Sequence, residues 1–387
     1  MLEYAFLAGR GTRWLREHGW LVLRSVFCAY LLLQLAPAPA RLLPYPPQIV
    51  TTEHPLVCIH TRLTDEVEDI KIQRSLQLVR EMGASTIVDF FPWPYMEVNK
   101  DQYDWHHPDR IISMARHEGL QVIARLGTVL GATPDWMHAG PNDPDKSPNY
   151  ISPETFANYA KFVGAFAAHF RGQVNKIIIW NEPNLSLEWG FRPSTPEDYV
   201  QLLKLSYLAA HEANPDVEVL GGALAPTAEP EGSANGLNEM AYLERMYQAG
   251  AAPYFDALAV HTYGLNQPPD AEPAPDQINF RRFELLMPIM QKYGDGNKPV
   301  YITESGWNED PRWTKAVRPG QRVQYTLDSF RYIEQKWPTV KNLCIWYFRL
   351  PVPTLNYVDY YAFATTEFRL KPIYSAIQDY TQGKGTP

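Results

Sequence analysis

The feature that most constrains the fold is an alternation, repeated eight times, between a short apolar run and a longer amphipathic stretch. Many of the apolar runs are rich in Val, Ile and Phe, which is typical of parallel strands buried on both faces. The stretches between them have the spacing of surface helices. Eight such units with no second composition regime predict an α/β fold, a single-domain (β/α)8 TIM barrel. An open doubly wound sheet would be expected to carry an early Gly-rich phosphate turn, which the sequence lacks.

Helix-ending glycines support this division of the chain. Gly83, Gly119, Gly172 and Gly250 each follow a helical pattern, where a left-handed cap is expected. The predicted strands are Leu56–Leu63, Ser85–Phe91, Leu120–Leu126, Lys176–Trp180, Val217–Ala223, Ala257–His261, Val300–Thr303 and Leu343–Phe348. The predicted helices are Asp65–Met82, Asp109–His117, Pro153–Phe170, Pro196–Ala213, Glu239–Ala249, Phe280–Lys292, Gly320–Lys336 and Pro372–Tyr380.

The N-terminal forty residues have the pattern of an export segment. Several arginines precede an apolar run from Ser25 to Ala36, which has the length of a signal h-region. We therefore predict a signal peptide or an uncleaved membrane anchor over 1–40, a linker and barrel lead-in over 41–55, and the catalytic barrel over 56–382. The protein is expected to be exported, either released or held at a membrane by this segment.

Charge and composition limit the partners. The net charge of −8 disfavours nucleic acid, because phosphate binding calls for clustered Lys and Arg. The aromatic fraction of 13% provides rings that can stack on sugar C–H groups or fill a core. Cys58 and Cys344 fall on the first and last predicted strands, so a bridge is conceivable, but their apolar flanks favour buried free thiols. Oligomeric state is left open.

Two apolar strands end abruptly in an acid. Residues 177–184 read IIIWNEPN, and residues 299–307 read PVYITESGW. These are the fourth and seventh strands, which lie across a barrel mouth from each other, so Glu182 and Glu304 could face one substrate from opposite sides. Glycoside cleavage needs such a pair of carboxyl groups.

These motifs resemble those of clan A glycoside hydrolases, the superfamily of cellulases, β-xylosidases and iduronidases. The resemblance implies that Glu182 is the general acid/base, Glu304 the nucleophile, and Asn181 the residue that holds the sugar 2-hydroxyl. Residues 259–264, AVHTYG, resemble the clan's His-x-Tyr segment, which implies that Tyr263 hydrogen-bonds the nucleophile and His261 lines the same subsite. Trp346 resembles the aromatic platform under the sugar.

Weaker likenesses point to the xylosidase and iduronidase branch. They are the segments 103–105, YDW, and 133–136, TPDW, the second of which makes Trp136 a candidate substrate-binding residue. Trp189 and Trp307 follow the two catalytic strands and are expected either to flank the cleft or to seal the core. Several clan members place an Arg near the end of strand two, where this chain has none; Arg125 on strand three or Arg62 could supply that charge.

The sequence therefore predicts a retaining O-glycoside hydrolase that acts on a poly- or oligosaccharide, without a metal or cofactor. A catalytically inactive carbohydrate-binding barrel is the alternative. A metal-dependent hydrolase is a third reading, but the histidines are scattered and no His-Glu-x-x-His pattern is present. The identity of the sugar is left open, because fold and reaction type do not determine it.

Overall fold

The computed structural model describes residues 18–21, 23–25, 27–28, 45–129, 134–137 and 150–384. The chain divides into two compact units, residues 1–46 and 47–387. In the first unit, residues 18–21, 23–25 and 27–28 are helical, whereas residues 45 and 46 are not. Most of the predicted signal or anchor segment, and most of the long connection after the third strand, lie outside the described residues. Within the described parts of the chain, no helix combines the length and the apolar character needed to cross a membrane.

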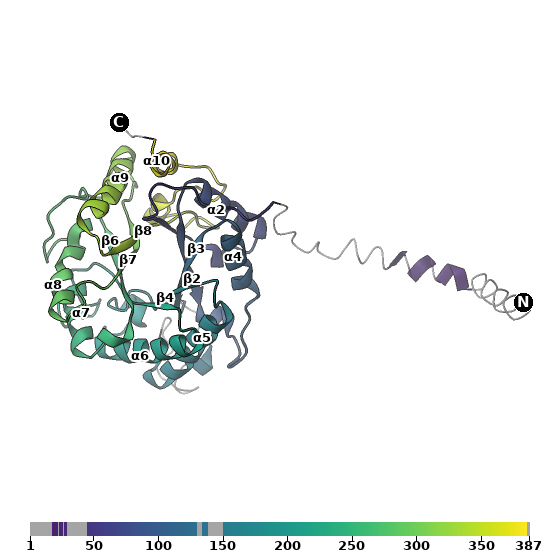
Figure 1. Ribbon diagram of the computed structural model, residues 1–387, viewed down its shortest axis with the longest axis horizontal. Helices are drawn as coiled ribbons and strands as arrows, with labels where there is room; N and C mark the ends of the chain where they lie inside the picture. Colours follow the sequence, from purple (N-terminus) through teal and green to yellow (C-terminus); the bar gives the residue numbers. More distant parts are fainter. Residues whose placement is uncertain are drawn as a thin grey trace, which may run out of the picture. The chain divides into compact units, whose positions relative to one another are not determined.

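The second unit is a closed barrel in which each strand pairs in parallel with its sequence neighbours and β1 closes on β8. The predicted TIM barrel is therefore confirmed. Figure 1 shows the strands at the centre and the helices around them. The strands are β1 Val57–His60, β2 Thr86–Pro92, β3 Gln121–Gly127, β4 Lys176–Ile179, β5 Glu218–Leu224, β6 Ala257–Tyr263, β7 Val300–Gly306 and β8 Val340–Trp346.

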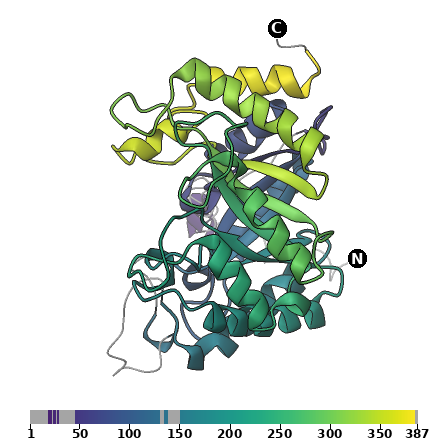
Figure 2. The same ribbon diagram turned by 90° about the vertical axis from the view of Figure 1, so that its left-hand side faces the viewer.

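The helices follow the strands along the outside of the barrel. Figure 2 shows α9 and α10 side by side in light green and yellow, consistent with their direct packing. The α-helices are α2 Asp69–Glu81, α3 Trp93–Met96, α4 His106–His117, α5 Phe156–His169, α6 Pro196–Ala213, α7 Glu239–Gln248, α8 Met287–Lys292, α9 Pro319–Lys336 and α10 Pro372–Thr381. The 3₁₀ turns are η1 Leu63–Asp65, η2 Asp135–Met137, η3 Pro153–Thr155, η4 Leu187–Trp189, η5 Ala252–Tyr254, η6 Phe280–Leu285 and η7 Tyr357–Tyr361.

Element boundaries differ from the prediction in a few places. The helix expected over 280–292 is η6 followed by α8, and Pro288 lies in the first turn of α8, where its missing N–H costs no hydrogen bond. Strands β6 and β7 run two and three residues further than predicted, so Glu304 lies within β7. The four helix-ending glycines do have positive φ angles, from 76° to 85°.

The two cysteines inside the barrel differ from the prediction. The register places Cys58 directly opposite Cys344, with their Cα atoms 4.1 Å apart, and the two form a disulfide. Free thiols were expected from the apolar flanks. The flanking residues, however, point outward to the helices, while both cysteines point inward into the same small cluster.

Candidate active site

The site is built on the apolar layer inside the barrel. Cys58, Ile123, Ala259 and Cys344 belong to that layer. Side chains alternate along a strand, so the residues two positions further on β1, β3, β6 and β8 point inward one layer higher. These residues are His60, Arg125, His261 and Trp346. The same periodicity that fills the barrel therefore collects polar and aromatic groups at the carboxyl ends of its strands.

Glu304 reaches this layer through irregular pairing of β7. The register shifts between Val260 and His261 on one side of β7 and between Ile302 and Ser305 on the other. Such irregularities redirect a side chain, and the shift sets Glu304 opposite His261.

The carboxylate of Glu304 is 7% exposed and receives hydrogen bonds on both oxygens. Arg125 Nη1 donates to Oε1, and the hydroxyl of Tyr263 donates to Oε2 at 2.8 Å. Burial alone would raise the pKa of Glu304, but the charges of His261 and Arg125 and the bond from Arg125 hold it well below its usual range. Burial also raises the pKa of Tyr263 far above its usual value, so that hydroxyl keeps the proton it donates. Glu304 is consequently ionised at neutral pH.

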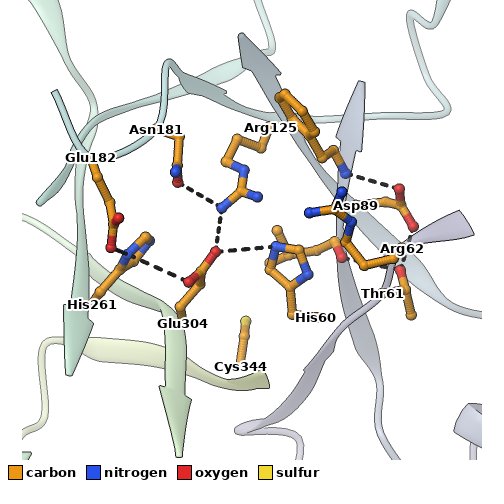
Figure 3. Close-up of polar contacts among 12 residues, drawn as sticks. His60, Thr61, Arg62, Asp89, Arg125, Asn181, Glu182, His261, Glu304 and Cys344 are labelled. Carbon is orange, nitrogen blue, oxygen red and sulfur yellow. Dashed lines mark hydrogen bonds and ion pairs between the residues drawn. The ribbon is translucent and has the colours of Figure 1, made fainter. Parts of the chain in front are cut away.

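Glu182 follows β4 in a strained turn. The φ angles of Trp180 and Glu182 are 71° and 40°, which non-glycine residues adopt rarely. The Glu182 carboxylate is 17% exposed, and its Oε1 lies 2.7 Å from Nδ1 of His261 (Figure 3). One carboxylate oxygen of Glu182, one of Glu304 and a ring nitrogen of His261 all lie within 4.8 Å of one another. The two acids therefore face one small volume.

Arg125 joins the two sides of the site. Its Nη1 donates to Oδ1 of Asn181 at 2.7 Å as well as to Glu304, as Figure 3 shows. The sequence left open whether Arg125 or Arg62 supplies the positive charge near Glu304, and the structure places Arg125 there. Arg62 instead pairs with Asp65 at 2.6 Å. Glu182, His261 and Glu304 are the one group of described residues spaced for a metal, but a guanidinium bound to Glu304 disfavours a cation there.

Trp346 is the aromatic residue that the structure does bring to the site. It pairs with His60 in the β1–β8 register and lies half-buried, 5.5 Å from the ring of Tyr361. Tyr361 in turn contacts the ring of Tyr263 at 5.7 Å. An aromatic wall therefore adjoins the tyrosine that binds Glu304.

Three other tryptophans that were candidates for substrate contact have packing or hydrogen-bond partners in the protein. Trp189 is 5% exposed and packs on Trp180 at 5.4 Å. Trp307 is 1% exposed, and its Nε1 donates to the carbonyl of Gln267 at 2.7 Å. Trp136 donates to the carbonyl of Val98 at 3.0 Å and packs edge-on against Trp93. Trp189 and Trp307 thus seal the core, which was the alternative left open for them, while substrate contact by the partly exposed Trp136 stays a prediction.

Two residues of the site were not selected from the sequence. His60 is fully buried, with Nε2 3.5 Å from Oε1 of Glu304. Burial and then the charge of Arg125 lower its pKa well below the usual value, so the ring is neutral. Glu188 lies on η4, and burial and then the charge of Glu182 raise its pKa to about 7. The position of His60, two residues after Cys58, could have identified it; Glu188 had no such signal.

A (β/α)8 barrel with carboxyl groups from β4 and β7 facing each other resembles the clan A glycoside hydrolases. Comparison with known proteins points the same way. A family model described as β-galactosidase, glycoside hydrolase family 42, matches residues 64–177, a segment that ends before Asn181. No curated protein sequence matches the chain significantly.

Solved structures of glycoside hydrolases share the fold. A family 39 glycoside hydrolase from the gut symbiont Bacteroides cellulosilyticus WH2 is 20% identical with a TM-score of 0.66, over 87% of this chain and 65% of that one. A monomeric β-xylosidase from Caulobacter crescentus CB15 is 18% identical with a TM-score of 0.61, over 86% and 69%. A family 39 enzyme from Xanthomonas axonopodis pv. citri is 16% identical with a TM-score of 0.62, over 91% and 72%. The chain thus spans less than two thirds of the first of these proteins. The expected resemblance to clan A is confirmed, and the likeness to the xylosidase structures is a likeness of fold.

Proposed function

We propose that the protein is a retaining O-glycoside hydrolase of poly- or oligosaccharides, with Glu304 as nucleophile and Glu182 as general acid/base. The observation that carries this proposal is the pair of facing carboxyl groups, with oxygens within 4.8 Å of each other. Retaining glycosidases hold their carboxyl groups about 5–5.5 Å apart, whereas inverting ones need about 6.5–9.5 Å to admit a water molecule. The separation supports double displacement.

In the first step Glu304 attacks the anomeric carbon while Glu182 transfers its proton to the departing glycosidic oxygen. Glu304 suits the attack because Arg125 and Tyr263 hold it ionised and aligned. Its charge falls as the new bond forms, and the proton of Glu182 leaves with the alcohol.

In the second step Glu182, now ionised, removes a proton from water, and the resulting hydroxide displaces Glu304 from the anomeric carbon. Asn181 is set to hold the sugar 2-hydroxyl, and a hydrogen bond there strengthens as positive charge develops on the ring. Trp346 provides the apolar surface beneath the sugar. The product has the same anomeric configuration as the substrate.

The test is cleavage of aryl β-glycosides, followed by NMR of the first product anomer. The galactoside, xyloside, glucoside and mannoside are the first choices, because the matched family and solved neighbours carry those names. We expect a retained anomer. An inverted product would overturn the double displacement. Sugar binding without cleavage of any substrate would favour the alternative, an inactive carbohydrate-binding barrel.

We also propose that the segment over residues 1–40 directs export, on the basis of its sequence pattern. The check is the N-terminus of protein recovered from producing cells and their medium. A mature chain that starts near Arg41 outside the cytoplasm is expected for a cleaved signal, and full-length protein in membranes for an anchor. Full-length protein in the cytoplasm would contradict export.

A further inference from the structure

His60 is the last residue of β1 and lies inside the barrel, beside Glu304. It pairs with Val88 on β2 and with Trp346 on β8, and its carbonyl accepts a hydrogen bond from the N–H of Phe348 at 2.9 Å. The side chain is fully buried. The closure of the barrel between β1 and β8 therefore sets the position of this ring.

The ring of His60 is a buried polar group without a full hydrogen bond. Among the residues that the structure describes, neither Nδ1 nor Nε2 has a hydrogen-bond partner. Nε2 lies 3.5 Å from Oε1 of Glu304, just beyond the usual length of an N–H···O bond (Figure 3). A buried polar group that lacks a partner lowers the stability of the fold, which an apolar side chain would avoid. A function in the site explains a histidine here better than packing does.

The position of the ring decides which nitrogen carries its proton. Burial and then the charge of Arg125 lower the pKa of His60 well below its usual value, so the ring is neutral and has a single N–H. The ionised Glu304 would repel a nitrogen lone pair and attracts an N–H. Nε2 is therefore the nitrogen that bears the proton, directed at Oε1 of Glu304.

The two oxygens of Glu304 face different surroundings. Oε2 lies 3.7 Å from Nδ1 of His261, which is itself 2.7 Å from Oε1 of Glu182. Oε1 of Glu304 instead lies beside Arg125 and His60. Figure 3 shows His60 and Glu182 on opposite sides of Glu304. Oε2 is therefore the oxygen that faces the substrate, and Oε1 is the oxygen that the protein holds.

We propose that His60 is a positioning residue whose Nε2–H donates to Oε1 of Glu304 during both steps of the reaction. The proposal rests on the proposed function and adds a further residue to it. A shift of about 0.3 Å closes the contact to hydrogen-bond length. Tyr263 donates to Oε2, the oxygen that the sugar takes up in the covalent intermediate, whereas His60 and Arg125 hold the other oxygen.

The role of His60 follows the charge on Glu304. In the first step Oε2 bonds to the anomeric carbon, the glycosidic bond breaks, and the departing oxygen takes the proton of Glu182. Oε1 becomes the carbonyl oxygen of a glycosyl ester. In the second step the water oxygen bonds to the anomeric carbon and its proton goes to Glu182, while the bond to Oε2 breaks and its electron pair returns to Glu304. His60 keeps its proton throughout, and its N–H stabilises the returning charge.

The experiment compares His60→Leu, which removes the N–H, with His60→Gln, whose amide nitrogen is as many bonds from the backbone as Nε2. The rates are kcat/KM on an aryl glycoside and kcat on a dinitrophenyl glycoside, for which the second step is slow. A hydrogen bond to a charged group corresponds to roughly 10- to 100-fold, so both rates should fall by that factor in His60→Leu. His60→Gln should recover most of the loss. His169→Gln is the matched control, because His169 is 33% exposed and pairs with Asp109 on the outside of the barrel.

Thermal melting separates this role from a structural one. His60→Leu replaces an unpaired polar ring by an apolar side chain, so its melting temperature should not fall although its rates do. Wild-type rates in His60→Leu, or rates in His60→Gln no higher than in His60→Leu, would overturn the proposal.

Nitrogen-15 NMR of the histidine rings tests the contact even if neither variant folds. We expect the His60 proton on Nε2, with a resonance that moves in Glu304→Gln. A proton on Nδ1 would overturn the proposal. If the wild type cleaves no glycoside, the proposed hydrolase function fails and the role of His60 fails with it. Cleavage with a retained anomer that does not depend on His60 refutes the role of His60 alone.

Discussion

Two glutamates of the site have pKa values that are shifted in opposite directions. Glu304 on β7 is buried under a guanidinium and a tyrosine hydroxyl, and its pKa is held well below the usual range. The pKa of Glu188 on η4 is raised to about 7, first by burial and then by the charge of Glu182. Burial alone would raise both pKa values.

The charge of Arg125 accounts for the difference. Nη1 of Arg125 donates to Glu304 directly and also to Asn181. Glu304 thus pairs with the positive charge, whereas at Glu188 burial and the charge of Glu182 outweigh the charge of Arg125. A direct hydrogen bond from the guanidinium therefore keeps Glu304 ionised although it is buried.

The largest effect is expected when Glu304 loses its charge. Glu304→Gln keeps the shape but removes the nucleophile, so kcat should fall by at least about 10⁴-fold. Steady-state rates on the best aryl glycoside measure this loss of kcat. Glu231→Gln is the control, because Glu231 is a 79% exposed acid on the loop after β5, and circular dichroism verifies folding. A folded variant within 100-fold of the wild type would show that Glu304 is not the nucleophile.

Removing the cation that Glu304 and Asn181 share should shift the pKa of Glu304 upward, the direction seen for Glu188. Arg125→Gln leaves Glu304 buried with less positive charge, so its pKa should rise and the acid limb of the kcat/KM profile should move to higher pH. At neutral pH the loss should be roughly 10²- to 10³-fold. Arg62→Gln, which breaks the pair with Asp65 and leaves the hydrogen bonds of Glu304 in place, is the control. An acid limb that stays in place in Arg125→Gln would contradict this account.

A smaller change tests the second hydrogen-bond donor to Glu304. Tyr263→Phe removes the hydrogen bond to Oε2 of Glu304 and keeps the ring contact with Tyr361. One bond to a charged acceptor corresponds to a loss of roughly 10- to 100-fold in kcat/KM. Tyr357→Phe serves as the control, since Tyr357 lies on η7 outside the hydrogen bonds of Glu304. Wild-type rates in Tyr263→Phe would place the alignment of Glu304 on Arg125 alone.

The smallest expected effect is on the pH dependence of the protein's stability, through Glu188. The pKa of Glu188 is raised in the folded protein, so the folded state holds its proton longer and loses stability as pH rises from about 4.5 to about 7. Glu188→Gln removes that loss. Its melting temperature relative to the wild type should therefore increase by about 1–3 °C between pH 5 and pH 8. A constant difference across this range would indicate that Glu188 titrates as an ordinary surface acid.

The outcome for individual residues shows which parts of the site can be predicted from a sequence. Glu304 and Arg125 lie on strands and Glu182 lies three residues after one, where a period of two and the order of the strands indicate the position of a side chain. Glu188 lies on a turn whose course depends on the indole of Trp180. The tryptophans were ambiguous because composition does not tell whether a ring faces a sugar or the core.

The sequence by itself determined the barrel, its strand order and the position of Glu182 and Glu304 at strand ends, because apolar periodicity and strand-end motifs are local properties of the chain. Only the tertiary structure decided the Cys58–Cys344 disulfide, the choice of Arg125 over Arg62 and the burial of His60 beside Glu304. Each of these depends on the register and packing of segments distant in the chain, and local patterns carry no information on such distances.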